Sequence, residues 1–235
     1  MMTATVYCAI GDIHGEHARL VDLHLQVLTH AREAFPKARL QFIHLGDLVD
    51  RGPDSCGVIS YLMAFEARMR PRPITLRGNH EQMMIDAYAA GDRLATAWRH
   101  WSMNGGDATL ESYALKPAPV LEAHLAWLAG LPTIHEAEEA GLVFVHAGID
   151  PDLFPDCGAQ AHMWTRRREF LDPRCWTAPG LRQKRVVHGH TPTHDSLPES
   201  AGNGQRLNID TGAVYGGRLT AACLRTGEPD LFFHS

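Results

Sequence analysis

Apolar and polar positions in the N-terminal part of the chain follow two alternating patterns. Short apolar runs that end at, or just before, a Gly-containing polar turn predict β-strands at residues 5–10, 40–45 and 74–76. Between and after them, apolar residues recur at helical spacing, which predicts helices at residues 16–35, 55–69 and 81–90. In the first helix, for example, Leu20, Val27 and Ala31 share one face. This β-α-β-α-β-α order predicts a sheet with crossover helices.

The pattern changes in the rest of the chain. Helices are expected at residues 93–101, 107–115 and 120–128, and a hairpin is expected from residues 133–137 and 142–146. Further short strands are expected at residues 185–188, 205–209, 218–224 and 231–233. We expect the later strands to be mostly antiparallel, because their connections look too short for crossover helices. The predicted fold class is α/β (α+β): a mixed sheet or β sandwich flanked by helices. With no repeat, low-complexity tract or linker, residues 1–235 are expected to form a single domain.

Composition excludes several classes of protein. Hydrophobic residues make up 45% and charged residues 21%, which argues against disorder, collagen and coiled coil. The formal charge of −5 argues against a nucleic-acid partner. No apolar run approaches the roughly 18 residues of a membrane span, so no membrane partner is expected. The absence of a signal-peptide pattern, together with five cysteines and no CxxC pair, predicts a cytoplasmic protein with free thiols.

Polar clusters follow the predicted strands, where open α/β sheets place their sites. The clusters are Gly11-Asp12-Ile13-His14-Gly15, Gly46-Asp47-Leu48-Val49-Asp50-Arg51-Gly52, Gly78-Asn79-His80-Glu81, His146-Ala147-Gly148 and His188-Gly189-His190-Thr191. Carboxylates, imidazoles and an amide brought together in this way suit Mn, Fe or Zn. The clusters therefore predict a metal site.

Each feature also has a simpler interpretation. A Gly-Asp pair after a strand is usually only a turn, and Asn79 alone is more often a cap. We interpret His188 as a packed strand histidine, and Trp98 and Trp101 as core or pocket wall. Residues 166–168, three consecutive arginines, would by default be a solvated charged face. Only the recurrence of the clusters after successive strands favours a metal site over these simpler interpretations, and it does so only for residues within the clusters.

The motifs GDIHG, GDLVDRG, GNHE, HAG and HGHT, in this order, resemble those of the calcineurin-like metallophosphoesterases. Within that superfamily they resemble the phosphoprotein phosphatase family, and most of all the bacteriophage lambda protein phosphatase and its bacterial relatives. The similarity runs from about Val6 to Leu224. It implies a two-layered β sandwich flanked by helices, with two metal ions at the strand ends.

The resemblance also implies a role for each motif residue. Asp12 and His14 would hold the first metal, Asp47 would bridge both, and Asn79, His146 and His190 would complete the second. His80 would be the general acid with Asp50 as its partner, and Arg51 and Arg166 would bind phosphate. Arg167 and Arg168 offer competing registers for the last role. The cofactors would be two divalent ions, Mn first, with Fe or Zn as alternatives. The reaction would be attack on phosphorus by a hydroxide that both metals activate.

The substrate expectation rests on finer features of the motifs. The implied function is a metal-dependent phosphomonoesterase, a serine/threonine and possible tyrosine protein phosphatase acting on a phosphorylated protein, peptide or small phosphoester. His146-Ala147-Gly148 replaces the His-Gly-Gly of eukaryotic members, and Ile209-Asp210-Thr211-Gly212 replaces their Ser-Ala-Pro-Asn-Tyr. The alternative is hydrolysis of dinucleoside polyphosphates, but the symmetrical diadenosine tetraphosphatases usually have Asn-His-Asp and lack an acid at the Asp50 position. A non-catalytic metal-binding module is the third possibility. No motif indicates an oligomeric state.

Overall fold

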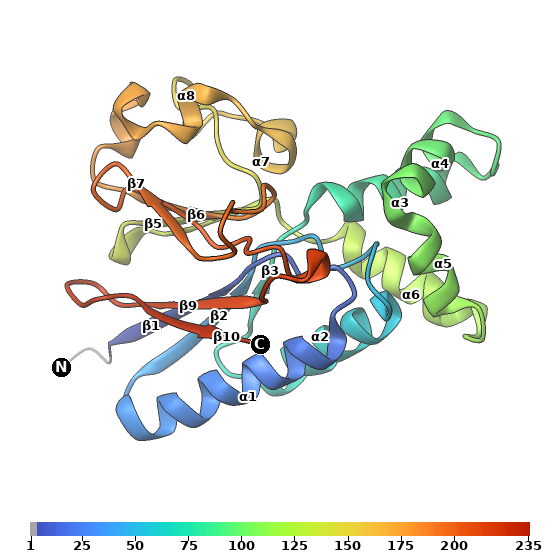
Figure 1. Ribbon diagram of the computed structural model, residues 1–235, viewed down its shortest axis with the longest axis horizontal. Helices are drawn as coiled ribbons and strands as arrows, with labels where there is room; N and C mark the ends of the chain where they lie inside the picture. The colour runs from blue at the N-terminus through green and yellow to red at the C-terminus, as the bar shows by residue number, and fades with distance from the viewer. Residues whose placement is uncertain (1–3) are drawn as a thin grey trace.

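Two five-stranded sheets packed face to face form the centre of the protein, in a computed structural model that describes residues 4–235 (Figure 1). The first sheet has the order β10-β9-β1-β2-β3, formed by β1 (Thr5–Ile10), β2 (Arg39–His44), β3 (Ile74–Thr75), β9 (Thr220–Leu224) and β10 (Leu231–His234). The second has the order β4-β5-β6-β8-β7, formed by β4 (Ile134–Ala137), β5 (Leu142–Val145), β6 (Arg185–His188), β7 (Glu199–Ala201) and β8 (Arg206–Asn208). The predicted fold class, a mixed β sandwich flanked by helices, is confirmed.

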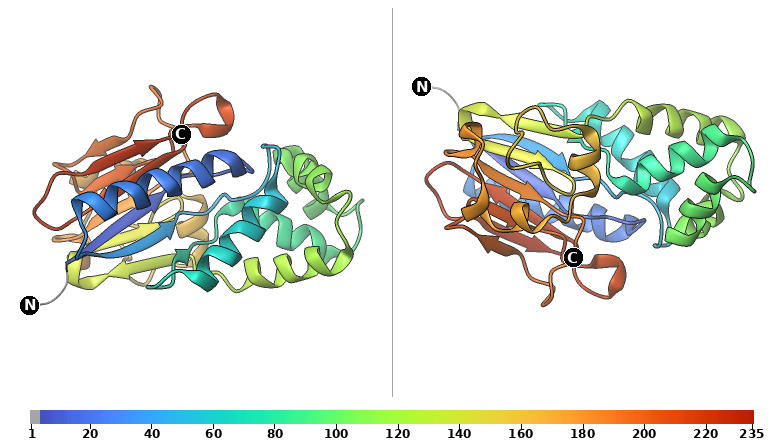
Figure 2. Two further views of the ribbon diagram at one scale, coloured as in Figure 1. Left: turned by 90° about the horizontal axis from the view of Figure 1, so that it is seen from below. Right: turned by 90° about the horizontal axis from the view of Figure 1, so that it is seen from above.

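Helices cover the outer face of each sheet and extend beyond one end of the sandwich. The first sheet is covered by α1 (His17–Ala34) and α2 (Ser55–Arg68), and the second by α7 (Ala159–Trp164) and α8 (Arg168–Leu171) (Figure 1). The helical lobe beside the sheets consists of α3 (Asn79–Ala90), α4 (Thr96–Trp101), α5 (Asp107–Tyr113) and α6 (Ala118–Ala129) (Figure 2). Within residues 4–235, no helix combines the length and the apolar character needed to cross a bilayer.

The central strands are buried on both faces. Along β1, Cys8 and Ile10 pack toward the helices of the first sheet, whereas Tyr7 and Ala9 pack between the two sheets with Phe144 of β5. Alternate side chains of a strand point to opposite faces, so a strand covered on both sides needs apolar residues at every position. This explains why the strands appear in the sequence as continuous apolar runs.

The second sheet differs from the expected antiparallel arrangement. β5 pairs with β6 in parallel and β6 pairs with β8 in parallel, whereas β4–β5 and β7–β8 are antiparallel. The expectation is right for the pairs β4–β5, β7–β8, β1–β9 and β9–β10, and wrong for the two parallel pairs. The parallel pairs arise because the connection from β5 to β6 contains α7 and α8, and the connection from β6 to β8 contains β7. Both are long enough to return the chain to the start of a parallel neighbour. These three elements were missed in the sequence because each is only three to six residues long.

Parallel order determines where the site lies. β1, β2 and β3 are parallel in the first sheet, so their carboxyl ends share one edge. β5 and β6 are parallel in the second sheet, so the residues that follow them also share an edge. A further difference concerns α3, which begins at Asn79 rather than at the expected residue 81. Asn79 and His80 therefore lie in the first turn of a helix instead of in the preceding loop.

Candidate metal centre

Side chains from both sheets meet at one end of the sandwich. Two groups of buried residues have ligand atoms within 4.8 Å of one another: His14, Asp47 and His80, and Asp47, His146 and His190. Asn79 joins the second group, because its Oδ1 lies 2.9 Å from His146 Nε2 and 3.0 Å from His190 Nδ1. Five of the six predicted metal ligands are thus in contact, and Asp47 belongs to both groups.

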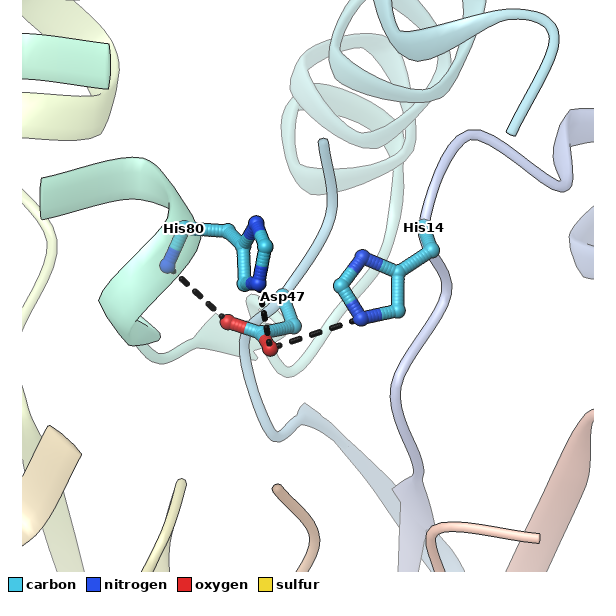
Figure 3. Close-up of side chains that lie close together, drawn as sticks. All are labelled: His14, Asp47 and His80. Atoms are coloured by element: carbon cyan, nitrogen blue, oxygen red, sulfur yellow. Dashed lines mark hydrogen bonds and ion pairs between the residues drawn. The ribbon is translucent and has the colours of Figure 1, made fainter. Parts of the chain in front are cut away.

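The two oxygens of the Asp47 carboxylate face different groups. Oδ1 lies 3.3 Å from His146 Nε2, whereas Oδ2 lies 3.4 Å from His14 Nε2 and 3.9 Å from His80 Nε2 (Figure 3). Burial alone would raise the pKa of Asp47, but the surrounding imidazoles, His146 first, hold it well below its usual range. An ionised carboxylate with one oxygen toward each group has the geometry that a bridging ligand requires.

Backbone carbonyls set the tautomers of two histidines. His14 Nδ1 lies 2.8 Å from the carbonyl oxygen of Val49, and His146 Nδ1 lies 3.0 Å from that of Leu45. A carbonyl oxygen can only accept, so each Nδ1 carries the proton and each Nε2 presents a lone pair to the site. Burial lowers the pKa of His14 to about 3 and also lowers the pKa of His146. Burial thus favours the neutral form of both imidazoles, which is the form that binds metal.

The donor set fits a divalent cation. His146 Nε2, Asn79 Oδ1 and Asp47 Oδ1 all present lone pairs, yet Nε2 lies within 2.9 Å of the amide oxygen and 3.3 Å of the carboxylate oxygen. Such acceptors repel one another unless a cation lies between them. Imidazole nitrogens with carboxylate and amide oxygens, and without thiolate, suit Mn, Fe or Zn.

Asp12 lies beside the two groups rather than within either of them. Its carboxylate oxygens accept the backbone N–H of His190 at 3.1 and 3.0 Å. Burial, then the charges of Asp210 and Asp47, raise the pKa of Asp12 well above its usual range. A Cβ at Gly189 would lie 2.0 Å from Asp12 Oδ1, so only glycine allows this close approach. Asp12 is next to the centre, and its role as a ligand stays a prediction.

Backbone strain is concentrated at this end of the sandwich. Among residues 4–235, seven non-glycine residues have positive φ, and five of them carry the candidate chemistry: His14 (42°), Asp47 (49°), Asp50 (72°), Arg51 (69°) and His190 (72°). Non-glycine residues adopt this region at a cost of about 1–3 kcal/mol each, and they do so mainly at functional sites. The surrounding contacts must therefore hold these loops in place.

Glu81 supplies much of that restraint, and the sequence alone did not single it out as a functional residue. Its buried carboxylate accepts the backbone N–H groups of Asp47 (2.9 Å), Leu48 (2.7 Å), Val49 (3.2 Å) and Gly78 (2.8 Å). Burial, reinforced by Asp47, raises the pKa of Glu81 to about 7 even though these N–H groups oppose the rise. The sequence did carry one signal for this role. Glu81 lies three residues after Gly78 at the start of a helix, and a Glu at that position commonly accepts the backbone N–H of the capping residue.

His80 and Asp50 form a buried pair next to the metal groups. His80 Nδ1 lies 2.7 Å from Asp50 Oδ2. Burial alone would lower the pKa of His80, but the carboxylates of Asp47 and Asp50 outweigh it and raise that pKa above its ordinary value. Asp50 also accepts the indole N–H of Trp101 at 2.9 Å and the hydroxyl of Thr109 at 2.7 Å. The pair is held in the arrangement that a protonated imidazole needs.

The helical lobe therefore has a role that we did not predict. As expected, the segment between residues 93 and 132 folds as helices. Trp101, at the end of α4, is fully buried and donates to Asp50, while Trp98 is half-buried and packs against it. Interpreting Trp101 as a core residue was correct. His188 is likewise a packed strand histidine, stacked edge-on against Phe170.

The candidate phosphate-binding arginines lie at the outer edge of the centre. Arg51 is half-buried, its Nη1 lies 2.7 Å from His14 Nε2, and its backbone N–H donates to the Gly105 carbonyl. Arg166 is exposed. Burial is the main cause of the lowered pKa of His146, and the charge of Arg166 makes a smaller contribution in the same direction. Arg167 instead forms an ion pair with Asp150 at 2.5 Å. Between Arg166 and Arg167, this geometry favours Arg166. The third candidate, Arg168, is exposed at the start of α8.

Comparison with known proteins agrees with the fold and the centre. The family model for calcineurin-like phosphoesterases matches residues 6–234 of this sequence. The chain belongs to this family. Calcineurin-like phosphoesterases depend on two metal ions, which matches the two groups around Asp47.

Individual calcineurin-like phosphoesterases similar to this chain differ in their named substrates. Serine/threonine-protein phosphatase 1 of Salmonella typhimurium is 32% identical over 226 residues, which cover 91% of this chain and 89% of that protein. An asymmetrical bis(5'-nucleosyl)-tetraphosphatase of Bacillus mycoides is 26% identical, covering 91% and 88%. The solved structure of a candidate diadenosine tetraphosphatase has a TM-score of 0.65 at 21% identity, covering 100% of this chain and 99% of its own, and shows the shared fold.

Replacing Asp47 with Asn should have a larger effect than replacing Asp12 with Asn. Asp47 contacts both groups, so Asp47→Asn should weaken the binding of two ions at once. It should reduce kcat/KM by at least about a hundredfold, which corresponds to about 2.7 kcal/mol of transition-state stabilisation. Metal content per chain, measured by elemental analysis after dialysis, and turnover of an aryl phosphate would check this. Asp86→Asn, an exposed change on α3, is the matched control. Two retained ions with a near-normal rate in the Asp47 variant would contradict the bridging role.

Glu81→Gln should destabilise the protein and weaken metal binding together. In the unchanged protein these backbone N–H groups donate to carboxylate oxygens. The Gln amide replaces one oxygen with an N–H₂ group, which cannot accept, so a buried donor is left unsatisfied at a cost of about 1–3 kcal/mol. Thermal unfolding with and without Mn would measure both effects. Glu111→Gln, on the exposed face of α5, should change neither quantity. Unchanged stability in the Glu81 variant would show that the loops do not depend on this carboxylate.

Proposed function

We propose that this protein is a phosphomonoesterase that removes phosphate from serine, threonine or tyrosine side chains of proteins or peptides, with Mn as its preferred ion. The observation that carries the proposal is the buried pair of His80 and Asp50, because it supplies a proton next to the ion-binding groups. The serine/threonine phosphatase relative at 32% identity supports the same substrate class. The five cysteines are free thiols, which supports a cytoplasmic location.

Divalent ions held by the candidate ligands would supply Lewis-acid activation of water and of the phosphoryl group. Their ligands would be His14, Asp47, Asn79, His146 and His190, with Asp12 alongside. Arg51 and Arg166 neutralise charge on the phosphoryl oxygens, for which the planar guanidinium is well suited. His80 gives its proton to the leaving oxygen. Asp50, fixed by Trp101 and Thr109, keeps the imidazole oriented and charged.

The acid pair favours phosphomonoesters of poor leaving groups. A serine or threonine alkoxide needs a proton as it departs, and a positioned acid accelerates such a step by about 10²–10⁴-fold. A nucleotide phosphate leaves readily without that proton. A buried imidazole whose pKa is raised by two carboxylates, Asp47 and Asp50, is therefore of most use on a phosphorylated side chain.

Hydrolysis of dinucleoside polyphosphates is the second candidate. It is favoured by the similarity to the bis(5'-nucleosyl)-tetraphosphatase of Bacillus mycoides at 26% identity over most of both chains. The motif His146-Ala147-Gly148-Ile149 also resembles that of the symmetrical diadenosine tetraphosphatases. The two candidates share the metal centre and differ in the leaving group, so leaving-group experiments separate them.

His80→Asn should lower kcat without changing metal content. On a phosphoserine peptide the loss should reach about 10²–10⁴-fold, because the departing alkoxide is left without its acid. On aryl phosphates the loss should shrink as the phenol becomes more acidic. Steady-state rates across a series of substituted phenyl phosphates would measure this slope. An equal loss for good and poor leaving groups would argue against the acid role.

A direct comparison of substrates should favour phosphopeptides. Protein stripped of metal and reloaded with Mn should turn over phosphoserine, phosphothreonine and phosphotyrosine peptides with higher kcat/KM than diadenosine tetraphosphate. The stripped protein in excess chelator should be inactive on all of them. A preference for the dinucleotide by more than about tenfold, or roughly 1.4 kcal/mol, would replace this function with the second candidate.

A further inference from the structure

An exposed aromatic ring lies at the edge of the candidate centre. Tyr215 is 62% exposed, and its ring centroid lies 5.5 Å from Cζ of Arg51. Within residues 4–235 its phenol makes no hydrogen bond to the protein. A large exposed side chain beside a candidate phosphate-binding arginine is informative, because most large apolar side chains here are buried. None of the roles described above uses this ring.

The ring is presented by a braced turn. Tyr215 closes a 3-10 turn that begins at Ala213, between Gly212 (φ 72°) and Gly216 (φ 84°). Arg19 Nη1 donates to the carbonyls of Ala213 at 3.1 Å and Gly217 at 2.9 Å, which ties the turn to α1. The backbone that carries the ring is therefore restrained on both sides.

The base of the same segment reaches the metal centre. Asp210, five positions before the ring, is buried, and its charge contributes to the raised pKa of Asp12. Thr211 continues the segment with a hydrogen bond from its Oγ1 to the Arg218 carbonyl at 2.6 Å. One segment thus runs from beside Asp12 outward to the ring, which fixes where Tyr215 lies relative to the candidate centre.

The position of the ring selects a particular ligand. If Arg51 binds phosphoryl oxygens, as the proposed function has it, the group bonded to the ester oxygen lies next to its guanidinium. The Tyr215 ring centroid lies 5.5 Å from the guanidinium carbon, a cation–π separation, so a group bonded to a phosphate on that guanidinium is within reach of the ring. A phenyl ring bonded directly to the ester oxygen falls within this reach. A serine side chain is too short to reach it, and a nucleobase is held farther from phosphorus by its ribose.

We propose that Tyr215 forms an aryl subsite: its ring contacts the aromatic leaving group of phosphotyrosine and of other aryl phosphate monoesters. This rests on the proposed function, because it assumes that Arg51 binds the phosphate of a monoester. The subsite gives the centre a preference for phosphotyrosine over phosphoserine in peptides of otherwise identical sequence.

The test compares Tyr215→Leu and Tyr215→Phe with the unchanged protein, each loaded with Mn. Substrates are a phosphotyrosine and a phosphoserine peptide of the same sequence, phenyl and ethyl phosphate, and, for comparison, diadenosine tetraphosphate. Tyr215→Leu should raise KM for the two aryl substrates about three- to tenfold, the effect of losing one aromatic pair, with little change in kcat. Its effect on the two alkyl substrates should stay below about twofold, and Tyr215→Phe, which keeps the ring, should behave like the unchanged protein.

Two further measurements separate substrate contact from an effect through Arg51. Inhibition by inorganic phosphate reports on Arg51 without a leaving group, so its inhibition constant should not change in Tyr215→Leu. Metal content should also stay the same. Leu115→Ala removes another exposed apolar side chain, 97% exposed at the end of α5, and should alter none of these values.

Several outcomes would overturn the subsite. Equal losses on aryl and alkyl substrates, or weaker phosphate inhibition, would mean that Tyr215 acts only by orienting Arg51. A loss confined to diadenosine tetraphosphate would mean that the ring stacks on a nucleobase instead. If the unchanged protein hydrolyses neither peptide, the proposed function fails, but the comparison of phenyl with ethyl phosphate still decides whether Tyr215 recognises an aryl group.

Discussion

The buried carboxylate of Asp47 is the interaction on which the rest of the centre depends. It is 2% exposed, it lies in a turn with φ of 49°, and its two oxygens face two different sets of imidazoles. A charged group this deeply buried is costly unless it is paired, and a strained turn persists only when its surroundings hold it. Both conditions are met by neighbours from elsewhere in the chain: histidines on one side and the carboxylate of Glu81, which accepts the Asp47 N–H, on the other.

Each part of the fold contributes a different component to the chemistry. The parallel strand ends of the two sheets place the metal-binding side chains at one edge of the sandwich. The helical lobe fixes the proposed acid pair: Trp101 and Thr109 both donate to Asp50, which in turn pairs with His80. The segment after β8 leads outward to Tyr215 beside Arg51. Under the proposed function, metal binding, proton donation and contact with the leaving group would thus fall to separate elements.

The sequence was sufficient for the fold class and for most of the centre, because each ligand motif directly follows a strand and carries its own glycine turn. That pattern predicted a metal site, and the resemblance to the metallophosphoesterases supplied its ligands. The structure brings five of these, His14, Asp47, Asn79, His146 and His190, together. Two kinds of information were missing. Strand direction in the second sheet depends on the path of a long irregular connection. The contacts of Asp50 with Trp101 and Thr109 span 51 and 59 positions, and local pattern carries no signal at that separation.

The most direct test of this account is a crystal structure of the Mn-loaded protein with anomalous diffraction data collected at the Mn edge. The account predicts two anomalous peaks about 3.5–4 Å apart, the spacing typical of dinuclear hydrolases. One should lie next to Asp47 Oδ1 with Asn79, His146 and His190, and the other next to Asp47 Oδ2 with His14. A single peak, or two peaks of which only one is in contact with Asp47, would contradict the central claim that this carboxylate is shared by two ions.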